Sequence, residues 1–461
     1  MRIPGKHATV CVQFLLGLYL LSLSDRAEAI PAFARKYKTS CVTCHLAVPK
    51  RNAFGEAFRR NGYTLPAGDA EFVKQEPISL GAPAHKRTFP NAVWPGTLPA
   101  EFPLSAYVHQ RFTQEFGDSE DTDRSSFDMP HELEIVMGGT FGETFSFMGE
   151  YVLFEDGMNA PGLGRLFFQV NDLVGPENLL NVRFGRLEPG ITDGLTDNNR
   201  IMLEHATTLN YSATGHWKPR DLQSGMEVSG IVAHRYQYIV GVVNGEGAVV
   251  DDQTDEKDVY ARLAVKTGGL PFDGLRSDKP TSLETDDSWA DNALTAGIYA
   301  YHGNSAGPNA VDNDFSRYGW DVHASYERLD MFAGIIIGQD DNPENAVPQA
   351  LRASTGDGLR LRSRAWSVEA YYLVFPWLIP GLRVGGASSE QGAIEMDEFS
   401  TISPHLTLLA RANVRFTAEG FAKMDRSRPV EVLVQSGVPI GTQDDRSWNL
   451  KWIKLNAMFV F

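Results

Sequence analysis

The chain is poor in cysteine, in net positive charge and in long apolar runs. It has only three cysteines in 461 residues, which excludes a disulfide-built scaffold. Its net charge of −16 excludes nucleic acid as a partner, because phosphate binding needs a basic face. No stretch beyond the N-terminal region reaches about 18 uninterrupted apolar residues, so we expect no transmembrane helix. The 43% of hydrophobic residues nevertheless predicts a folded chain with a large buried surface.

Residues 1–29 have the three parts of a secretory signal peptide. Arg2 and Lys6 form a positive start, residues 10–22 are apolar, and Ala27-Glu28-Ala29 is a small-x-small cleavage site. A retained N-terminal anchor is the alternative. We expect export, a mature chain that begins at Ile30, and loss of Cys11 with the signal peptide.

The two remaining cysteines stand together in Cys41-Val42-Thr43-Cys44-His45. C-x-x-C-H is the attachment signature of c-type haem, in which both thiols bind the macrocycle and the histidine binds the iron. A thioredoxin-like redox pair would need a βαβ setting, and a zinc site would need a second Cys/His cluster. We therefore predict one covalently bound haem c, with Cys41 and Cys44 as the thioether sites and His45 as the proximal ligand.

The second axial ligand of the iron is less constrained by the sequence. Residues 30–128 contain no methionine, and His45 and His85 are the only histidines before His109. If the haem segment supplies its own distal ligand, His85 is the candidate. Two alternatives remain. The iron could be five-coordinate, or the barrel could supply the distal ligand from His109, Met129 or His131.

Three regions differ in composition before residue 104. Residues 30–66 form the predicted haem segment, and residues 30–70 carry seven basic and two acidic side chains, so this part can dock on the acidic remainder. A solvated basic face is the alternative. Apolar residues at helical spacing predict a helix over residues 50–61, with Phe54 and Phe58 against the haem or in a small core. Residues 67–103 are rich in proline, glycine and alanine and predict a linker.

From Leu104 onward the apolar residues alternate with polar ones. One such set is Tyr318, Trp320, Val322, Ala324 and Tyr326, and another is Leu406, Leu408, Ala410, Ala412, Val414 and Phe416. Strands of about ten residues with one apolar face are typical of transmembrane β-barrels. The final residues 453–461 have the same alternation and end on Phe461, as bacterial outer-membrane barrels do. The sequence predicts a mostly β protein, with a barrel of about sixteen strands over residues 104–461 behind a small α-helical haem domain.

The polar faces of these strands carry charges of both signs, which we expect to face the barrel lumen. They are Glu132, Glu134, Glu150, Asp321, Glu327, Glu369, Arg111, Arg262, Lys266, Arg411 and Arg415. This mixture favours neither a docked plug nor the selection of a solute.

Residues 30–66 resemble the N-terminal segment of fused outer-membrane cytochrome–porins. The resemblance rests on Ile30-Pro31-Ala32-Phe33-Ala34-Arg35, the C-x-x-C-H motif, Pro49, Asn52, Phe54-Gly55, Phe58 and Gly62-Tyr63. Val48 and Arg51 depart from the pattern, where an aromatic residue and leucine are expected. The resemblance implies one haem c domain in front of a porin-like barrel in the bacterial outer membrane. The best-known members of this family oxidise extracellular Fe(II), and similar segments occur in fused proteins with no assigned iron role.

Two classes of function follow. The first is one-electron transfer across the outer membrane, from extracellular Fe(II) or another donor to a periplasmic carrier, with the haem domain as a plug in a lipid-embedded barrel. The same parts would serve discharge to an external acceptor, and whether the chain is an Fe(II) oxidase stays open. The second is a diffusion porin whose haem acts as a gate or sensor. A soluble β-rich binding protein is a third interpretation, which the C-terminal strand opposes.

Overall fold

The computed structural model describes most of the chain after residue 30. The described residues are 31–66, 68–75, 78–79, 87–88, 97–98, 103–117, 123–142, 144–156, 161–175, 177–192, 196, 199–214, 217–245, 256–276, 283, 291–305, 312–343, 360–391, 394–429, 442–443 and 447–461. The predicted signal peptide with Cys11, the candidate ligand His85 and most of the linker lie outside them. None of the helices in these ranges has the length and apolar character needed to cross a membrane.

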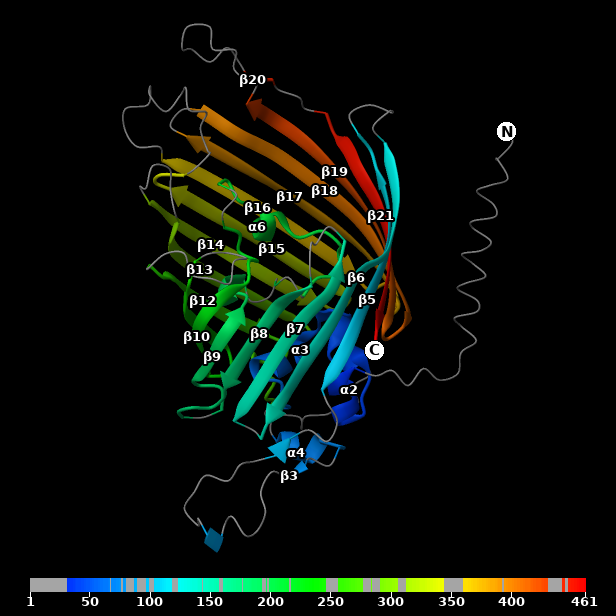
Figure 1. Cartoon of the computed structure of the whole chain (residues 1–461), viewed down its shortest axis with the longest axis vertical. Coiled ribbons are helices and arrows are strands. Elements are labelled where there is room, and N and C mark those ends of the chain that lie inside the picture. The colour runs from blue at the N-terminus through cyan, green and yellow to red at the C-terminus, as the bar shows by residue number, and fades with distance from the viewer. Residues whose placement is uncertain are drawn as a thin grey trace, which may run out of the picture.

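Sixteen antiparallel strands of the described chain form a closed barrel (Figure 1). They are β5 (Leu104–Glu115), β6 (Arg124–Phe141), β7 (Phe145–Glu155), β8 (Gly162–Val170), β9 (Asn181–Leu187), β10 (Gln223–Val232), β11 (Tyr236–Val243), β12 (Asp258–Gly268), β13 (Ala293–Ser305), β14 (Asn313–Tyr326), β15 (Leu329–Asp340), β16 (Leu361–Tyr372), β17 (Leu378–Gln391), β18 (Ile394–Arg411), β19 (Val414–Pro429) and β21 (Asn449–Val460). The two-residue β20 (Thr442–Gln443) pairs antiparallel with the end of β19. β21 pairs with β5, which closes the ring and confirms the predicted fold class.

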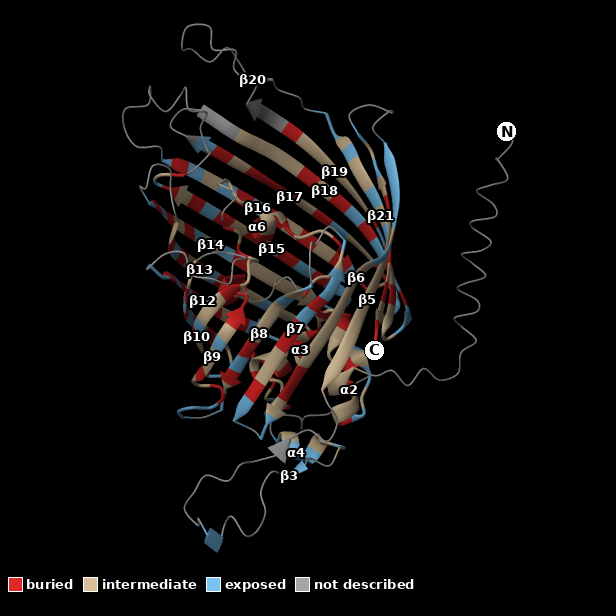
Figure 2. Cartoon of the chain, in the orientation of Figure 1, coloured by how far each residue is buried: buried red, intermediate tan, exposed pale blue. Residues whose placement is uncertain are grey.

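The strands point apolar side chains outward and polar ones inward. In β14, Tyr318 and Trp320 are exposed on the outside, whereas Arg317 and Asp321 are buried inside. Figure 2 shows this alternation of buried and exposed residues along the strands. Soluble monomers rarely expose large contiguous apolar patches. The outer surface of this barrel is apolar and its interior is charged, so the barrel is suited to a membrane in which lipid contacts the outer surface.

Most of the charges predicted to face the lumen do so. Glu150, Asp321, Glu369, Arg262, Lys266 and Arg415 are buried inside the barrel. Arg111, Glu132 and Glu134 line its main cavity. Arg262 pairs with Asp321, and the Arg383 Nε lies 2.7 Å from the Glu369 carboxylate. The prediction is wrong for Glu327 and Arg411, which are exposed because the strands end there and the alternation stops at the turn.

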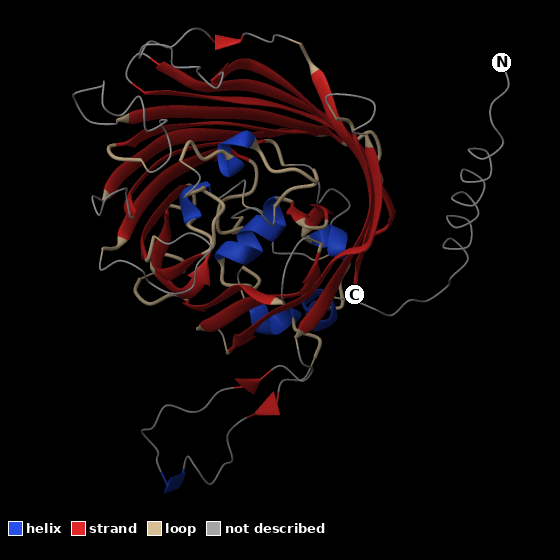
Figure 3. Cartoon of the chain, turned by 45° about the horizontal axis from the view of Figure 1, so that its top comes forward, coloured by secondary structure: helices blue, strands red, loops and turns tan. Residues whose placement is uncertain are grey.

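The haem segment lies inside one end of the barrel, away from β20 (Figures 1 and 3). It comprises α2 (Ala32–Tyr37), the 3-10 turn η1 (Cys41–Thr43), the β1–β2 pair (His45–Ala47 and Lys50–Arg51) and α3 (Ala53–Arg60). Tyr37, Phe58 and Leu65 form its small core. The helix predicted over residues 50–61 begins only at Ala53, because residues 50–51 pair with β1 and Asn52 caps the helix. Beyond it lie α4 (Asp69–Phe72) and the pair β3 (Ile78–Ser79) and β4 (Thr97–Leu98).

The segment contacts the barrel end at which most of the strand connections are short. Five connections there span two to five residues, including those between β14 and β15 and between β16 and β17. Leu46 packs with Leu373 and Leu409 at this end, and Val48 packs with Met458. The Lys50 Nζ also lies 3.1 Å from the Asp330 carboxylate in the wall, with both groups buried. Apolar packing and a buried ion pair therefore hold the segment in place.

A second insertion occupies the lumen beyond the haem segment. It is the lumen segment, which comprises the described residues 188–192, 196, 199–214 and 217–222 between β9 and β10, with η3 (Gly190–Thr192) and α6 (Thr207–Asn210). Ile191 packs with Ile239, and Leu209 packs with Phe332 of the wall. The Asn199 Oδ1 accepts a hydrogen bond of 2.8 Å from the Arg51 backbone N–H. The two insertions contact each other and together narrow the channel.

Candidate haem site

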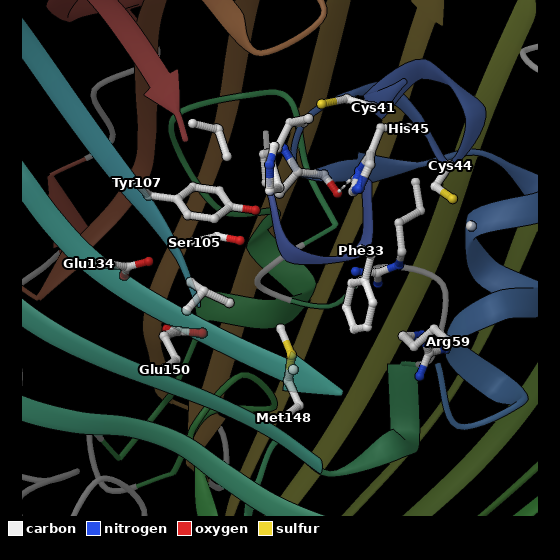
Figure 4. A pocket seen from close by; sticks show the side chains of 18 of the residues that line it. Phe33, Cys41, Cys44, His45, Arg59, Ser105, Tyr107, Glu134, Met148 and Glu150 are labelled. Carbon is white, nitrogen blue, oxygen red and sulfur yellow. Dashed lines mark hydrogen bonds between the residues drawn. The ribbon is translucent and has the colours of Figure 1, made fainter. Parts of the chain in front are cut away.

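Cys41, Cys44 and His45 border one cavity in the lumen (Figure 4). Cys41 is the first residue of the turn η1, and Cys44 caps its end. His45 follows as the first residue of β1. The turn therefore places the three side chains of the motif on the same cavity. Both cysteines are free thiols. The cavity has a volume of about 460 Å³, within the usual range of ligand pockets. The three predicted haem ligands therefore face a common space of suitable size.

The His45 ring is oriented for ligation through Nε2. Its Nδ1 lies 3.0 Å from the Pro49 carbonyl oxygen, which can only accept a hydrogen bond. In the neutral ring Nδ1 therefore carries the proton, and Nε2 is the nitrogen with the lone pair. Burial, with a smaller effect of the Arg51 charge, lowers the pKa of His45 to about 4. A neutral imidazole held by a backbone carbonyl is the usual form of a metal-binding histidine.

The cysteines do not have the character of a reactive redox pair. Burial, and secondarily the Cys41 thiolate, raises the pKa of Cys44 to about 12, and burial also raises the pKa of Cys41. Thioredoxin-like pairs instead lower a cysteine pKa to make a thiolate. A zinc site is disfavoured too, because the cluster of potential metal ligands that the described residues form contains neither cysteine.

Helix α3 is pressed against the back of this turn. A Cβ on Gly55 would lie 2.0 Å from the Cys44 carbonyl oxygen, so only glycine fits there. Asn52 joins the two elements: its Oδ1 accepts from Gly55 N–H at 2.9 Å, and its Nδ2 donates to the Thr43 carbonyl at 3.0 Å. Sequence reasoning noted both residues only as part of a resemblance. Their role in positioning the two cysteines comes from the structure.

The rest of the cavity combines apolar surfaces with charges of both signs, because glutamates line it as well as arginines. Phe33, Phe58 and Met148 contribute apolar surface, and Figure 4 shows Met148 and Tyr107 on the barrel side, opposite the haem segment. The arginines along the cavity are Arg51, Arg59, Arg111, Arg165, Arg183, Arg200 and Arg415. Guanidinium groups are the preferred partners of carboxylates. Several of them already pair with carboxylates of the chain, as Arg165 does with Glu150 and Arg183 with Glu227. The lining thus offers an apolar surface for a macrocycle and guanidinium groups for its propionates, in competition with these glutamates. Sequence reasoning missed most of it because the arginines come from distant parts of the chain.

The distal ligand stays a prediction. Met129 is exposed on the outer face, whereas His109 and His131 line the cavity. The His109 Nδ1 is 3.2 Å from the Glu132 carboxylate. Sequence reasoning missed three cavity methionines, which are Met148, Met202 and Met458. Met148 could have been found, because it shares the inward register of Ser146 and Glu150 in β7.

Comparisons with known proteins place the barrel fold only. No family model matches the chain, and no curated protein matches it. Among solved structures, the chain is similar to an anion-selective porin from Comamonas acidovorans, with 12% identity and a TM-score of 0.53 over 78% of this chain and 99% of the porin. It is also similar to the outer-membrane channel DcaP of Acinetobacter baumannii, with 11% identity and a TM-score of 0.52 over 78% and 96%. The barrel has the porin fold.

Proposed function

We propose that the protein transfers single electrons across the bacterial outer membrane through a haem c held in its barrel, as a member of the fused cytochrome–porin family. One observation carries this proposal: Cys41, Cys44 and His45 line a single cavity inside the lumen. When bound there, haem c supplies a one-electron couple. The chain supplies the imidazole ligand, the two thioether sites and a lining that limits access of water.

The outward apolar faces support the membrane location, and the connections support an orientation. Outer-membrane barrels have short periplasmic turns and longer extracellular loops. The end with the short connections would then face the periplasm, and the haem segment sits at that end. The cavity extends from Cys44 along β6 to His131, toward the end with the longer loops. An extracellular donor would enter the barrel at the end with the long loops. A periplasmic carrier would dock at the opposite end, against the haem segment.

The electron count of the proposed reaction is simple. A haem held by Cys41, Cys44 and His45 would supply a one-electron couple, so each Fe²⁺ that becomes Fe³⁺ would give one electron to the protein, and the periplasmic carrier would accept that electron. No atom or proton has to be transferred. Discharge to an external acceptor reverses the two steps, and the relative potentials decide the direction.

The test is anaerobic mixing of the purified haem-loaded protein with Fe²⁺, followed by the visible spectrum. We expect the ferrous haem c bands to appear, with a stoichiometry of one electron per chain. The matched variant Cys41→Ala/Cys44→Ala, purified in the same detergent, should show no such bands. A fully oxidised spectrum after prolonged incubation with excess Fe²⁺ would rule out Fe²⁺ as the donor.

A diffusion porin with haem as a gate or sensor is the second candidate. The porin fold of the solved neighbours fits this candidate better than it fits electron transfer. The lumen segment and the haem segment oppose it, since both occupy the channel. Conductance measurements in planar lipid bilayers distinguish the two candidate functions. A gated porin requires stable open channels whose conductance changes when the haem is reduced. Electron transfer requires no open channel.

A further inference from the structure

We propose that Asp128, His131 and Asp156 form a binding site for a divalent first-row transition-metal ion near the long-loop end of the lumen. These three residues are called the rim cluster. Each offers one ligand atom, and the three atoms lie within 4.8 Å of one another. Two ligands of one such ion, each about 2.1 Å from it, stand up to about 4 Å apart. Small side-chain rotations would therefore close the site.

The backbone brings the cluster together from two adjacent strands. Asp128 and His131 belong to β6, and Asp156 directly follows β7. The Asp156 N–H donates to the His131 carbonyl at 2.8 Å, which fixes these two residues side by side. Phe127 and Met129 are exposed on the outer face, so Asp128 between them points inward. The geometry is thus a property of the strand pairing.

The His131 imidazole distinguishes the rim cluster from a group of exposed carboxylates on a protein surface. The His131 Nδ1 is buried and has no hydrogen-bond partner among the described residues. A buried polar atom without a partner costs roughly 1–3 kcal/mol. Coordination of a cation shared with the two carboxylates would satisfy it. An imidazole beside a fixed pair of carboxylates is the donor set of Mn²⁺, Fe²⁺ and Zn²⁺ sites.

The charges around the cluster favour a cation of moderate affinity. Asp128 pairs in register with Arg111 of β5, which offsets one of the two carboxylate charges. Next along β6, Glu132 and Glu134 line the cavity and continue the line of carboxylates inward. Lys454 of β21, which pairs with Glu204, is a second cation that acts on His131. The two carboxylates would therefore attract a divalent ion without holding it irreversibly. Three protein ligands also leave coordination positions open for water.

The position of the cluster gives it a role that rests on the proposed function. His131 lines the same cavity as Cys44 and His45. Gly138, whose Cα faces the Phe33 ring, lies seven residues further along β6, about 20 Å away at the rise of a strand. The rim cluster would therefore capture the metal donor on the extracellular side and raise its concentration in the cavity that leads to the haem segment.

Binding is tested without any electron transfer. The haem-loaded protein in detergent is titrated with Mn²⁺, and the free ion is measured by room-temperature EPR. We expect one saturable site per chain in the wild type. Asp156→Asn and His131→Ala should each weaken it by about tenfold or more, because changes even in residues behind metal ligands cost that much. Asp156 is exposed, so its amide variant should keep the fold.

The matched control is His302→Ala, which removes an exposed imidazole from β13, near the same end of the barrel. It should bind Mn²⁺ like the wild type. Equal binding by the wild type and both cluster variants, or no saturable binding at all, would refute the site. Binding that depends on the cluster, in a protein whose haem Fe²⁺ does not reduce, would support the site and refute the proposed function instead.

Discussion

Cys44 is a half-buried thiol at the end of a turn, and the proposed function requires a covalent bond between this thiol and haem. Cys44→Ala should leave little covalent haem. The variant retains only Cys41, and the C-x-x-C-H signature needs both cysteines for attachment. The measurement is peroxidase staining of the protein on a denaturing gel. Val42→Ala, which changes an exposed side chain in the same turn, should stain normally. Normal staining of Cys44→Ala would contradict the haem assignment.

Gly55 sets how closely α3 approaches the same turn. In Gly55→Ala the new Cβ would meet the Cys44 carbonyl at 2.0 Å, so helix and turn must separate. Overpacking of this kind costs about 1–3 kcal/mol, and we expect lower haem loading and a lower unfolding temperature of the haem segment. Gly420→Ala in β19 is the control, since its Cβ would have only one neighbour, at 3.9 Å. Equal haem loading in both variants would show that the close approach is not required.

Helix α3 depends on Asn52 for two separate contacts. Loss of the helix cap in Asn52→Ala costs about 1 kcal/mol, and loss of the amide bonds to the Val42 and Thr43 carbonyls adds to it. Asn52→Asp keeps an oxygen for the cap but cannot donate to these carbonyls. We expect thermal unfolding, followed at the haem absorbance, to rank the wild type above Asn52→Asp and Asn52→Asp above Asn52→Ala. Identical melting of the two variants would show that only the donated bonds matter.

The β1–β2 pair is joined to the barrel wall by the Lys50–Asp330 ion pair. Lys50→Met leaves Asp330 buried with His323 and Ser325 as its remaining partners, at a cost of about 3 kcal/mol. The haem segment should then be released more readily, which limited proteolysis of the folded protein measures. Lys50→Met/Asp330→Asn removes the stranded charge and should recover much of the resistance. Equal proteolysis of the wild type and Lys50→Met would mean that apolar packing alone retains the segment.

At the scale of elements, the sequence predicted the strands and their outward faces, because these follow from periodicity. It did not predict features that lack a periodic pattern. Alternation identified the outward face of β14 and the final strand, because each residue's face follows from its neighbours. The helix α2 was not predicted, because six residues carry too little pattern. The alternation also misled at Glu327 and Arg411, since it cannot show where a strand ends.

At the scale of the whole molecule, the sequence predicted the haem segment as a plug in the barrel but not the contacts that hold it there. Its contacts join Leu46 to Leu409 and Asn61 to Asp273, across hundreds of residues. The motif C-x-x-C-H indicated the chemistry because its spacing is local. The cavity that the motif faces is built from many parts of the chain. Alternation predicted a lumen-facing position for Arg111 and Arg415, whereas Arg51, Arg59 and Arg200 lie outside the barrel strands and had no such signal. The lumen segment was likewise not foreseen.

The central claim is that the barrel carries electrons through a membrane by means of its haem segment. It is tested most directly with the haem-loaded protein in lipid vesicles that contain a soluble cytochrome c, with Fe²⁺ added outside under anaerobic conditions. The account predicts reduction of the entrapped cytochrome with the wild type, and only background reduction with Cys41→Ala/Cys44→Ala or with empty vesicles. Equal rates for the wild type and the haem-free variant would contradict it, because Fe²⁺ would then be passing through an open channel.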